Sequence, residues 1–297
     1  MTTMSNPERL EYRHPGVRMH FWSGGMPKIG GLQPILHWHD NFEMVLVLDG
    51  ELAMLVNGDK IRLMEGDFLF VNSGQIHKLC QSENKTGRYS MVIVHPEVLG
   101  CDTGMVFNAV EPLLKRKWLA QVVLKSGHTG KIPELFARLR ESETLEEIPA
   151  VVESVGLVFE LWAEMLRLFN KAGVLSNDAT SPLVERASDA EFEAVRAMVT
   201  FIHGHYGDKL TLKDIAAAGG VGRSRCCEIF ARHIGQSPIA FLNSHRLDVA
   251  ARLLRQTAAP IADLAFTCGF AQQSYFTQQF KETYGKTPQM WRKKKED

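Results

Sequence analysis

Hydrophobic positions follow a strand-like pattern in the first hundred residues of this chain. Apolar runs of four to six residues recur there, at intervals of about 8–12 residues that are typical of short antiparallel strands. Asp49-Gly50 and Asn57-Gly58 separate three of these runs, and such pairs favour tight hairpin turns. The pattern predicts an antiparallel β-sandwich or β-barrel with strands at 43–48, 52–56, 60–63, 68–71 and 89–94.

After Pro96 the apolar spacing changes to that of α-helices. Residues 133–147 begin with a proline, which suits the first turn of a helix because it has no N–H to leave unpaired. Residues 151–169 have apolar side chains at every third or fourth position. This second helix must bury one face against the β domain, the first helix or a second subunit. Residues 171–189 are rich in Gly, Ser, Asn, Asp and Pro, which predicts an interdomain linker.

The last hundred residues contain one helical pattern twice. In each copy a short amphipathic stretch is followed by a glycine turn and a longer helix, at 211–233 and again at 260–284. A Gly-x-Ser/Thr-Pro sequence closes both copies, at 235–238 and 285–288. Two short helices joined by a tight glycine turn indicate a helix-turn-helix unit, and the repeat indicates that the unit is duplicated. A predicted helix at 239–254 joins the two units.

These patterns predict an α+β multidomain protein. A chain of 297 residues is long enough for two domains. We expect an N-terminal antiparallel β-barrel with flanking helices and a C-terminal all-α domain with two helix-turn-helix units. The expected boundaries are 1–100 for the β domain, 101–175 for a helical support region, 176–189 for the linker and 190–297 for the all-α domain.

Charge is unevenly distributed along the chain. Residues 195–297 contain 15 Lys and Arg against 8 Asp and Glu, a net charge of +7. The rest of the chain contains 19 against 26, a net charge of −7. A basic C-terminal third beside an acidic remainder is expected when a nucleic-acid-binding module is attached to a domain with another task.

The longer helices of the two repeats carry the candidate DNA contacts. In the 272–284 helix, Phe276 and Phe280 form an apolar back, and the opposite side has the amides, hydroxyls and lysine that suit base edges and phosphates. A solvated surface helix would show the same polarity. In the corresponding helix of the first repeat, which ends at residue 233, we expect Cys226 and Phe230 to face inward. The candidate contacts are Arg223, Ser224, Arg225, Cys227, Glu228, Arg232, Gln272, Gln273, Ser274, Thr277, Gln278 and Lys281.

We expect these candidates to have two kinds of role. Lys281, Arg225 and Arg232 would mainly contact phosphates. Ser224 and Cys227, with the amides and hydroxyls of the second helix, would mainly read bases. Glu228 would place an anion toward the groove, where it could accept a hydrogen bond from cytosine but would repel phosphate.

The second repeat also contains a longer signature. The run I-A-x6-G-F-x3-S-Y-F-x3-F-K-x3-G-x-T-P-x2-W-R fills fourteen fixed positions between Ile261 and Arg292. It resembles the signature of the AraC/XylS family of bacterial transcription regulators. The resemblance implies binding to double-stranded promoter DNA, contact with RNA polymerase, and a homodimer formed through helices beside the N-terminal domain. The first repeat departs from the family pattern, because Gly222 stands where a capping serine is common.

Three histidines and a glutamate form a second constellation. His37, His39 and Glu43 are separated by even intervals, so a continuous strand would direct all three side chains to one face. His77 follows 34 residues after Glu43. The four residues are similar to the two cupin motifs, H-x-H-x3-E-x6-G and G-x5-P-x-G-x2-H, except that Asn72 replaces the proline.

The cupin resemblance leaves three interpretations of these four residues open. They could hold a divalent transition metal such as Zn, Mn, Fe or Ni through imidazole nitrogens and a carboxylate. Together with Trp38, they could line a pocket for a small-molecule effector without a metal, or they could be hydrogen-bonded core residues. A metal-dependent cupin enzyme fused to a DNA-binding domain is the alternative function. No further acid–base or nucleophile motif accompanies the four residues.

Sequence features also favour a cytoplasmic protein that does not enter a membrane. No apolar run reaches the ~18 residues of a membrane span, and the first residues contain no apolar stretch of the kind found in secretory signals. The five cysteines include no C-x-x-C pair. Their odd number favours reduced thiols.

Overall fold

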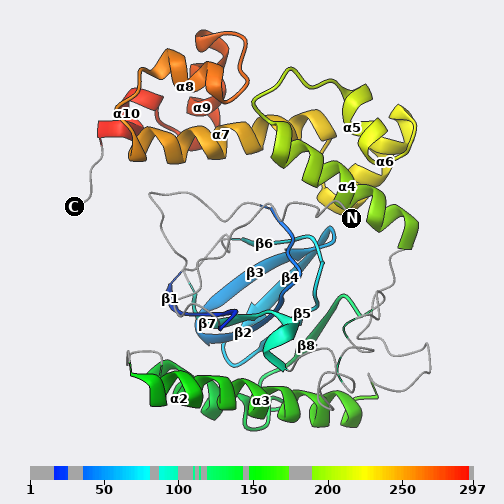
Figure 1. Cartoon of the computed structure of the whole chain (residues 1–297), viewed down its shortest axis with the longest axis vertical. Helices are drawn as coiled ribbons and strands as arrows, with labels where there is room; N and C mark the ends of the chain where they lie inside the picture. Colours follow the sequence, from blue (N-terminus) through cyan, green and yellow to red (C-terminus); the bar gives the residue numbers. More distant parts are fainter. Residues whose placement is uncertain are drawn as a thin grey trace. The chain divides into compact units, whose positions relative to one another are not determined.

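The computed structural model describes residues 17–25, 36–80, 87–99, 110, 114, 119–142, 147–173 and 189–293. The chain divides into two compact units. One unit contains the elements from β1 (Met19–Gly25) to α3 (Ile148–Lys171), and the other contains the helices from α4 (Asp189–His205) to α10 (Pro288–Lys293) (Figure 1). Residues 176–188 of the predicted linker lie outside the described residues.

The first unit contains two antiparallel sheets. Its remaining strands are β2 (Phe42–Asp49), β3 (Glu51–Val56), β4 (Asp59–Met64), β5 (Phe68–Val71), β6 (His77–Cys80), β7 (Arg88–Val94) and β8 (Gln121–Leu124). The five-stranded sheet has the order β1-β7-β2-β5-β8, and the three-stranded sheet has the order β4-β3-β6. The five strands predicted from the sequence are confirmed. The structure adds β1, the short strand β6, and β8, which lies in an apolar segment where cations obscured the pattern.

The two sheets do not close into a continuous barrel in the described residues, so of the predicted sandwich and barrel the arrangement is nearer the sandwich. Among the strands that the structure describes, none pairs across the two sheets. The tight hairpin at Asn57-Gly58 directs β4 back along β3, because both residues adopt positive φ, 52° and 99°. The other neighbour of β3 is β6, so these three strands form a sheet of their own that packs against the larger one.

Both faces of β2 are buried, which explains its unbroken apolar run. Phe42 and Met44 belong to a cluster shared with the helices, in which the ring of Phe42 stacks on Trp162 with centroids 4.8 Å apart. Val45 and Val47 belong to a second cluster, shared with strands of both sheets. Because side chains alternate along a strand, Glu43 lies on this second side, between the sheets.

Two helices cover the five-stranded sheet. They are α2 (Ile132–Ser142) and α3, and they pack against each other. Both helices were predicted, but the first was placed too long. Glu147 has an extended backbone (φ −86°, ψ 148°) and precedes α3, whose first turn contains a proline. On α3 the predicted stripe is confirmed at its centre, where Val158, Trp162 and Met165 are buried.

The second unit is entirely helical in its described residues. Between α4 and α10 lie α5 (Leu212–Ala218), α6 (Arg223–Ile234), α7 (Pro238–Gln256), α8 (Ile261–Thr267) and α9 (Gln273–Tyr284). The duplicated pattern is confirmed: α5 and α6 form one helix-turn-helix unit, α8 and α9 form the other, and α7 joins them. The helix α4 that precedes them buries one face, which includes Phe192, Val195 and Ile202.

Local residue choices set the ends of these helices. The Thr211 side chain accepts a hydrogen bond from the Asp214 N–H, and the Asp214 carboxylate accepts one from the Thr211 N–H, so a capping box begins α5. Gly269 adopts a φ of +80° and ends α8 as predicted. Gly235 and Gly285 end α6 and α9 with φ values of 77° and 69°.

The helix α10 was missed. Pro288, the last residue of the sequence that closes the second copy, also begins a new helix. Trp291 is buried, and its Nε1 donates a hydrogen bond to the backbone oxygen of Ala251 at 3.2 Å. This contact attaches α10 to α7.

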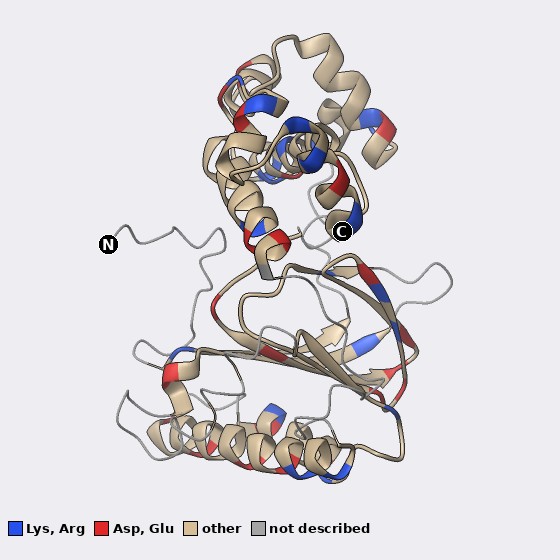
Figure 2. Cartoon of the chain, turned by 90° about the vertical axis from the view of Figure 1, so that its right-hand side faces the viewer, with Lys and Arg blue, Asp and Glu red and all other residues tan. Residues whose placement is uncertain are grey.

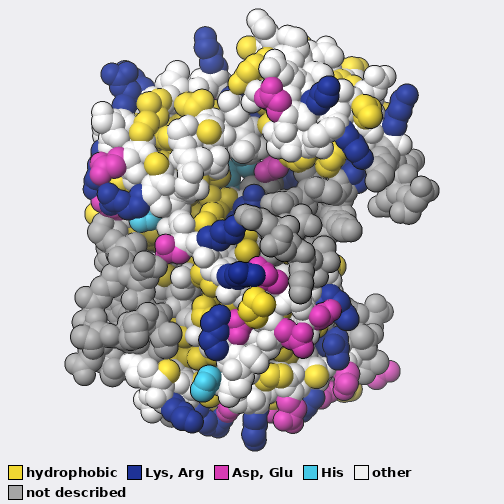
Figure 3. All heavy atoms as spheres, turned by 180° about the vertical axis from the view of Figure 1, so that it is seen from behind, with side chains coloured by type: hydrophobic (Ala, Val, Ile, Leu, Met, Phe, Trp, Pro, Cys, Tyr) yellow, Lys and Arg dark blue, Asp and Glu magenta, His cyan; other side chains and the backbone are white. Residues whose placement is uncertain are grey.

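The surface mixes charged and apolar side chains. Lys, Arg, Asp and Glu all occur on the helices of the second unit (Figure 2), where Phe266, Tyr275 and Met290 are exposed. Hydrophobic side chains are interspersed with charged and neutral ones on the face shown in Figure 3. Among the described residues, no helix combines the length and the hydropathy that a bilayer span requires.

Candidate nucleic-acid interface and ligand site

The helix α9 presents a polar face on an aromatic support. Phe276 and Phe280 are fully buried, with ring centroids 5.5 Å apart, and Phe280 contacts the ring of Trp291 at 5.7 Å. The predicted inward face is therefore confirmed. Thr277 is half-buried, and the exposed positions at and along the helix include Gln272, Gln273, Ser274, Gln278 and Lys281.

One exposed amide of α9 is held by a neighbour on its own helix. Gln278 Nε2 donates to Glu282 Oε1 at 2.9 Å, and Gln279 Nε2 donates to the other oxygen of the same carboxylate at 2.8 Å. Contacts one turn apart on an exposed helix stabilise it by only about 0.2–0.5 kcal/mol. They orient the Gln278 amide without preventing its rearrangement against a ligand.

The helix α6 has the same inner face but a different outer one. Cys226 and Phe230 are fully buried, as predicted. Arg223 and Ser224 are exposed, and Cys227 is half-buried. Gly222 is the N-cap and supplies no side-chain hydrogen bond, which agrees with the departure seen in the sequence.

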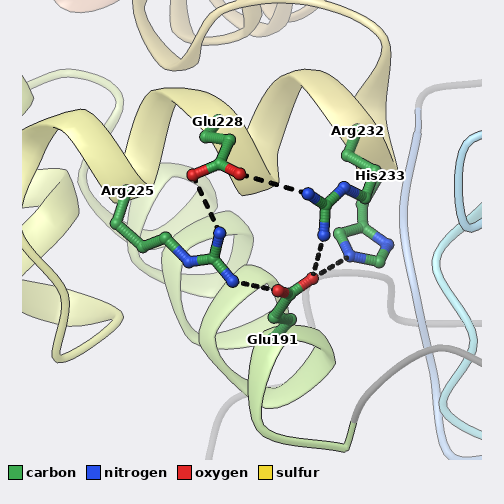
Figure 4. A network of polar contacts seen from close by, with 5 residues as sticks. All are labelled: Glu191, Arg225, Glu228, Arg232 and His233. Atoms are coloured by element: carbon green, nitrogen blue, oxygen red, sulfur yellow. Dashed lines mark hydrogen bonds and ion pairs between the residues drawn. The ribbon is translucent and has the colours of Figure 1, made fainter.

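A network of ion pairs connects α6 to the start of α4 (Figure 4). Glu191 of α4 pairs with Arg225 through one carboxylate oxygen and with Arg232 through the other, at 2.8 Å. Glu228 pairs with the same two arginines at 2.8 and 3.2 Å. His233 Nε2 lies 3.4 Å from Glu191. Two carboxylates thus face two guanidinium groups and an imidazole.

The Glu191 carboxylate is the centre of this network. Desolvation tends to raise its pKa, but the hydrogen bond with His233 and the charges of Arg225 and Arg232 outweigh that effect, and the pKa lies below its ordinary value. Glu191 therefore stays ionised at neutral pH and holds both arginines. Sequence reasoning missed Glu191, because it lies 34 and 41 residues from its arginine partners and no local motif connects them.

In the first unit, the structure brings three of the predicted ligand residues into direct contact. His39 Nε2 lies 3.0 Å from Glu43 Oε1, and His77 Nε2 lies 3.1 Å from the same oxygen. The two rings meet edge to face with centroids 5.0 Å apart. All three side chains are buried. His37 offers a fourth ligand atom, and all four candidate atoms lie within 4.8 Å of one another.

Backbone carbonyls select the tautomer of both buried rings. His39 Nδ1 lies 3.1 Å from the Asn41 oxygen, and His77 Nδ1 lies 2.8 Å from the Gln75 oxygen. A carbonyl only accepts, so each Nδ1 carries a hydrogen, and each ring directs its Nε2 toward Glu43. Histidines that bind metals are usually held in this way through their other nitrogen.

The Glu43 carboxylate completes a set of atoms that fits a divalent transition metal. Its Oε2 is buried and accepts no hydrogen bond from any described residue. Burial tends to raise the pKa of Glu43, but the charge of His77 and hydrogen bonds from His39 and His77 outweigh it, and the pKa lies well below its ordinary value. Imidazole nitrogens with one carboxylate suit Zn, Mn, Fe or Ni.

The sequence predicted this cluster from side-chain alternation along one continuous strand, and that explanation was wrong. His37 and His39 do not continue β2, because the chain bends at residues 40 and 41 before the strand begins at Phe42. The ligand atoms still converge, because the bend redirects His39 and β6 contributes His77. Trp38 is buried. Phe42, the first residue of β2, faces the helices.

Asn72 replaces the cupin proline for a visible reason. Its backbone N–H donates to the Ala120 oxygen at 2.9 Å, directly before β8, and its side chain donates to the Leu114 oxygen at 3.2 Å. Proline has no N–H and could not make the first bond. The substitution therefore attaches the segment before His77 to the chain that enters β8.

Two protein-family models agree with the two halves of this description. A cupin domain family matches residues 27–94, and a helix-turn-helix domain family matches residues 215–294. A crystal structure of ToxT from Vibrio cholerae aligns over 93% of this chain and 97% of that one, with 13% identity and a TM-score of 0.47.

Relatives along most of the chain are transcription regulators. The HTH-type transcriptional regulator ExsA of Pseudomonas aeruginosa is 33% identical over 259 residues, covering 85% of this chain and 86% of ExsA. YdeC of Bacillus subtilis, an HTH-type transcriptional regulator, is 27% identical and covers 89% and 88% of the two chains. The melibiose operon regulatory protein of Escherichia coli is 24% identical, covering 88% and 84%. The chain belongs to the AraC/XylS family of transcription regulators, with a cupin domain followed by a helix-turn-helix DNA-binding domain.

Proposed function

We propose that this regulator binds promoter DNA by placing α6 and α9 in successive major grooves, about one helical turn or ~34 Å apart. The observation that carries the proposal is the row of exposed amides and hydroxyls on α9, backed by the buried Phe276 and Phe280. Gln278 and Gln273 would read base edges, since an amide can pair with adenine through two hydrogen bonds. Ser274 and Thr277 would add hydroxyl contacts, and Lys281 would contact phosphate.

The helix α6 would contact DNA through fewer free groups. Ser224 and Cys227 would face bases, and Arg223, at the exposed first position of the helix, would contact phosphate. Arg225 and Arg232 reach phosphate only by exchanging the carboxylates of Glu191 and Glu228 for it. Glu228 would act through these two arginines rather than through a base.

We also propose that the cupin domain holds a divalent transition metal through His39, Glu43 and His77, with His37 as a fourth ligand. The buried, unpaired Glu43 Oε2 and the two carbonyl-held imidazoles support this assignment. When bound, the metal would act as a Lewis acid for an oxygen or nitrogen of a small-molecule effector. The protein's own part is to keep the carboxylate ionised, to orient both Nε2 atoms and to exclude water.

Effector binding would then change DNA binding through a population shift. The effector must have a different affinity for the arrangements that bind DNA well and badly, because only a differential affinity moves an equilibrium. By the same linkage, operator DNA would change the affinity for the effector by the same factor.

The regulator would act in the cytoplasm as a homodimer that contacts RNA polymerase. Ile148 and Val152 lie one turn apart on α3 and are 81% and 66% exposed. Apolar neighbours of this kind support α3 as the surface through which two copies pair. Light scattering of the purified protein tests the dimer, and a strictly monomeric protein at micromolar concentration would contradict it.

Selection from a random duplex pool with the full-length protein tests the DNA-binding proposal. We expect one enriched sequence with two contacted segments about one turn apart. Substitution of Lys281 by alanine should weaken binding to every sequence and flatten the salt dependence by about one unit of slope. Enrichment of no sequence, or of a site with a single contacted segment, would reject the two-helix docking.

Elemental analysis tests the metal proposal separately. We expect about one transition metal per chain in the wild-type protein and its loss in Glu43→Gln. Glu65→Gln, at an exposed glutamate on the turn between β4 and β5, is the matched control and should keep the metal. Equal, substoichiometric metal in all three proteins would reject the metal proposal.

The alternative function, a metal-dependent cupin enzyme, would use the same site but makes a different experimental prediction. An enzyme requires turnover of a small molecule by the metal-loaded protein, whereas a regulator requires only binding. Specific binding to an upstream promoter fragment by protein without stoichiometric metal would reject the enzyme alternative.

A further inference from the structure

Arg246 is a buried arginine in the middle of the helix that joins the two helix-turn-helix units. It lies near the middle of α7, between α6 and α9 in the chain, and only 9% of it is exposed. Burying a guanidinium group is costly unless hydrogen bonds compensate for lost water. The contacts of Arg246 therefore decide what it does.

The guanidinium group binds the first helix-turn-helix unit through backbone oxygens. Arg246 Nε donates to the Tyr206 oxygen at 2.8 Å, and its Nη2 donates to the Asp208 oxygen, also at 2.8 Å. Both oxygens lie in the loop between α4 and α5. Two parallel donors on a rigid planar fork hold this loop in one position and one orientation relative to α7.

The same guanidinium group contacts the turn of the second helix-turn-helix unit, between α8 and α9. The Arg246 guanidinium carbon lies 5.9 Å from the centre of the Phe270 ring. A Cβ atom on Gly269 would lie only 2.5 Å from the Tyr206 oxygen and 2.8 Å from Arg246 Nη2. A Cβ on Gly207 would lie 3.0 Å from the Thr267 oxygen. The loop between α4 and α5 and the turn between α8 and α9 therefore touch through their backbones beside Arg246.

These contacts create a second connection between the two helix-turn-helix units, in addition to α7. A single joining helix can bend, and bending would change the distance between α6 and α9. A lateral contact at the level of Arg246 restrains that bending. An apolar side chain would fill the space at a lower desolvation cost but would leave the Tyr206 and Asp208 oxygens without these donors.

We propose that Arg246 is a positioning residue that sets the distance and angle between α6 and α9, and with them the spacing of the two DNA segments that the protein accepts. This inference rests on the proposed docking of both helices. One additional base pair between the segments moves the second by ~3.4 Å and rotates it by about 35°, which a rigid pair of helices would not tolerate.

Binding to duplexes of altered spacing tests the proposal. The probes are the sequence selected by the wild-type protein and versions with one or two base pairs inserted between its contacted segments, and the proteins are full-length wild type, Arg246→Gln and Arg246→Lys. For the wild type we expect one insertion to weaken binding about tenfold or more. For both variants we expect the original and inserted duplexes to bind within about threefold of each other, because the restraint on α7 is lost.

Arg252→Lys is the matched control, an exposed arginine on the same helix, and should keep the wild-type discrimination. Circular dichroism establishes that each variant is folded. If the wild type itself ignores spacing, the two-helix docking fails. If folded Arg246 variants keep the full discrimination, or weaken on every duplex by one common factor, Arg246 stabilises the unit without positioning it, and the proposal is overturned.

Discussion

The two helix-turn-helix units have the same interior and different outer surfaces. α6 and α9 each contain twelve residues and each end at a glycine in the left-handed conformation. Phe230 and Phe280 occupy the same position of the two helices and are both fully buried. The helix that follows each unit begins at a proline, with a hydroxyl side chain accepting the capping hydrogen bond.

The outer faces differ in their polar side chains and in the ion pairs that these side chains form. On α6 the arginines at 225 and 232 pair with Glu191 and Glu228, whereas α9 has exposed amides and Lys281. Core positions are restricted by close packing, and surface positions are not. The comparison indicates that the two repeats share their core and differ in their outer faces. In the docking that we propose, α9 would discriminate bases and α6 would make adjustable contacts with the DNA backbone.

The largest expected effect tests whether the two interiors are equivalent. Phe230→Ala and Phe280→Ala each remove a fully buried ring and should each destabilise the protein by about 3–5 kcal/mol. Urea unfolding followed by circular dichroism measures the change. Tyr275→Ala removes an aromatic ring that is 45% exposed and should change stability by less than about 0.5 kcal/mol. A negligible effect at one of the two phenylalanines would show that the cores differ.

The next effect compares the same outer position in both helices. Gln278→Ala should cost about 1–3 kcal/mol of discrimination at one base pair and leave binding to other sequences nearly unchanged. Glu228→Ala removes an anion and a partner of both arginines, so it should not weaken binding. A panel of duplexes with single base-pair changes measures both. Equal loss of discrimination in the two variants would contradict the division of roles.

A smaller effect concerns the first helix of each unit. Thr211→Ala removes the capping box of α5 and should lower the free energy of unfolding by about 1 kcal/mol. Asp263→Ala, in the first turn of α8 where the N-cap Pro260 makes no side-chain hydrogen bond, should have a smaller effect. Thermal unfolding of both variants measures the difference.

The capping effect also has a predicted pH dependence. The hydrogen bonds from Thr211 lower the pKa of Asp214 below its ordinary value. The stabilisation is therefore present above about pH 4, the usual range for an unfolded aspartate, and is lost as the pH falls through the lowered pKa. The wild type and Thr211→Ala should become more alike at that point. A difference that grows on acidification would contradict the capping explanation.

The smallest effect tests the ion pairs of α6. Glu191→Gln should release Arg225 and Arg232 for phosphate, raise affinity for all duplexes several-fold, and steepen the salt dependence by about 0.9 for each arginine released. Glu193→Gln makes the same change of charge at a nearby exposed position of α4 and should leave the salt slope unchanged. A flatter slope for Glu191→Gln would show that Glu191 positions the arginines for DNA rather than withholding them.

Much of the fold was predictable because it depends on near neighbours in the chain. The Asn57-Gly58 hairpin, the capping residue Thr211 and the helix end at Gly269 follow from backbone preferences of single residues. The apolar spacing of Phe276 and Phe280 determines which side of α9 is buried. The motif spacing also identified His39, Glu43 and His77, although its explanation by strand alternation was wrong.

The sequence by itself thus determined the helices other than α10, most strands, the duplicated unit and the candidate ligand residues. Tertiary structure decided that the two sheets do not close into a barrel and that backbone carbonyls orient the two imidazoles. It also decided that Glu191 pairs with arginines 34 and 41 residues away and that Arg246 connects the two helix-turn-helix units. The reason is physical: capping, turns and periodicity are interactions between near neighbours in the chain, whereas ion pairs and buried donors find their partners only where packing brings distant segments together.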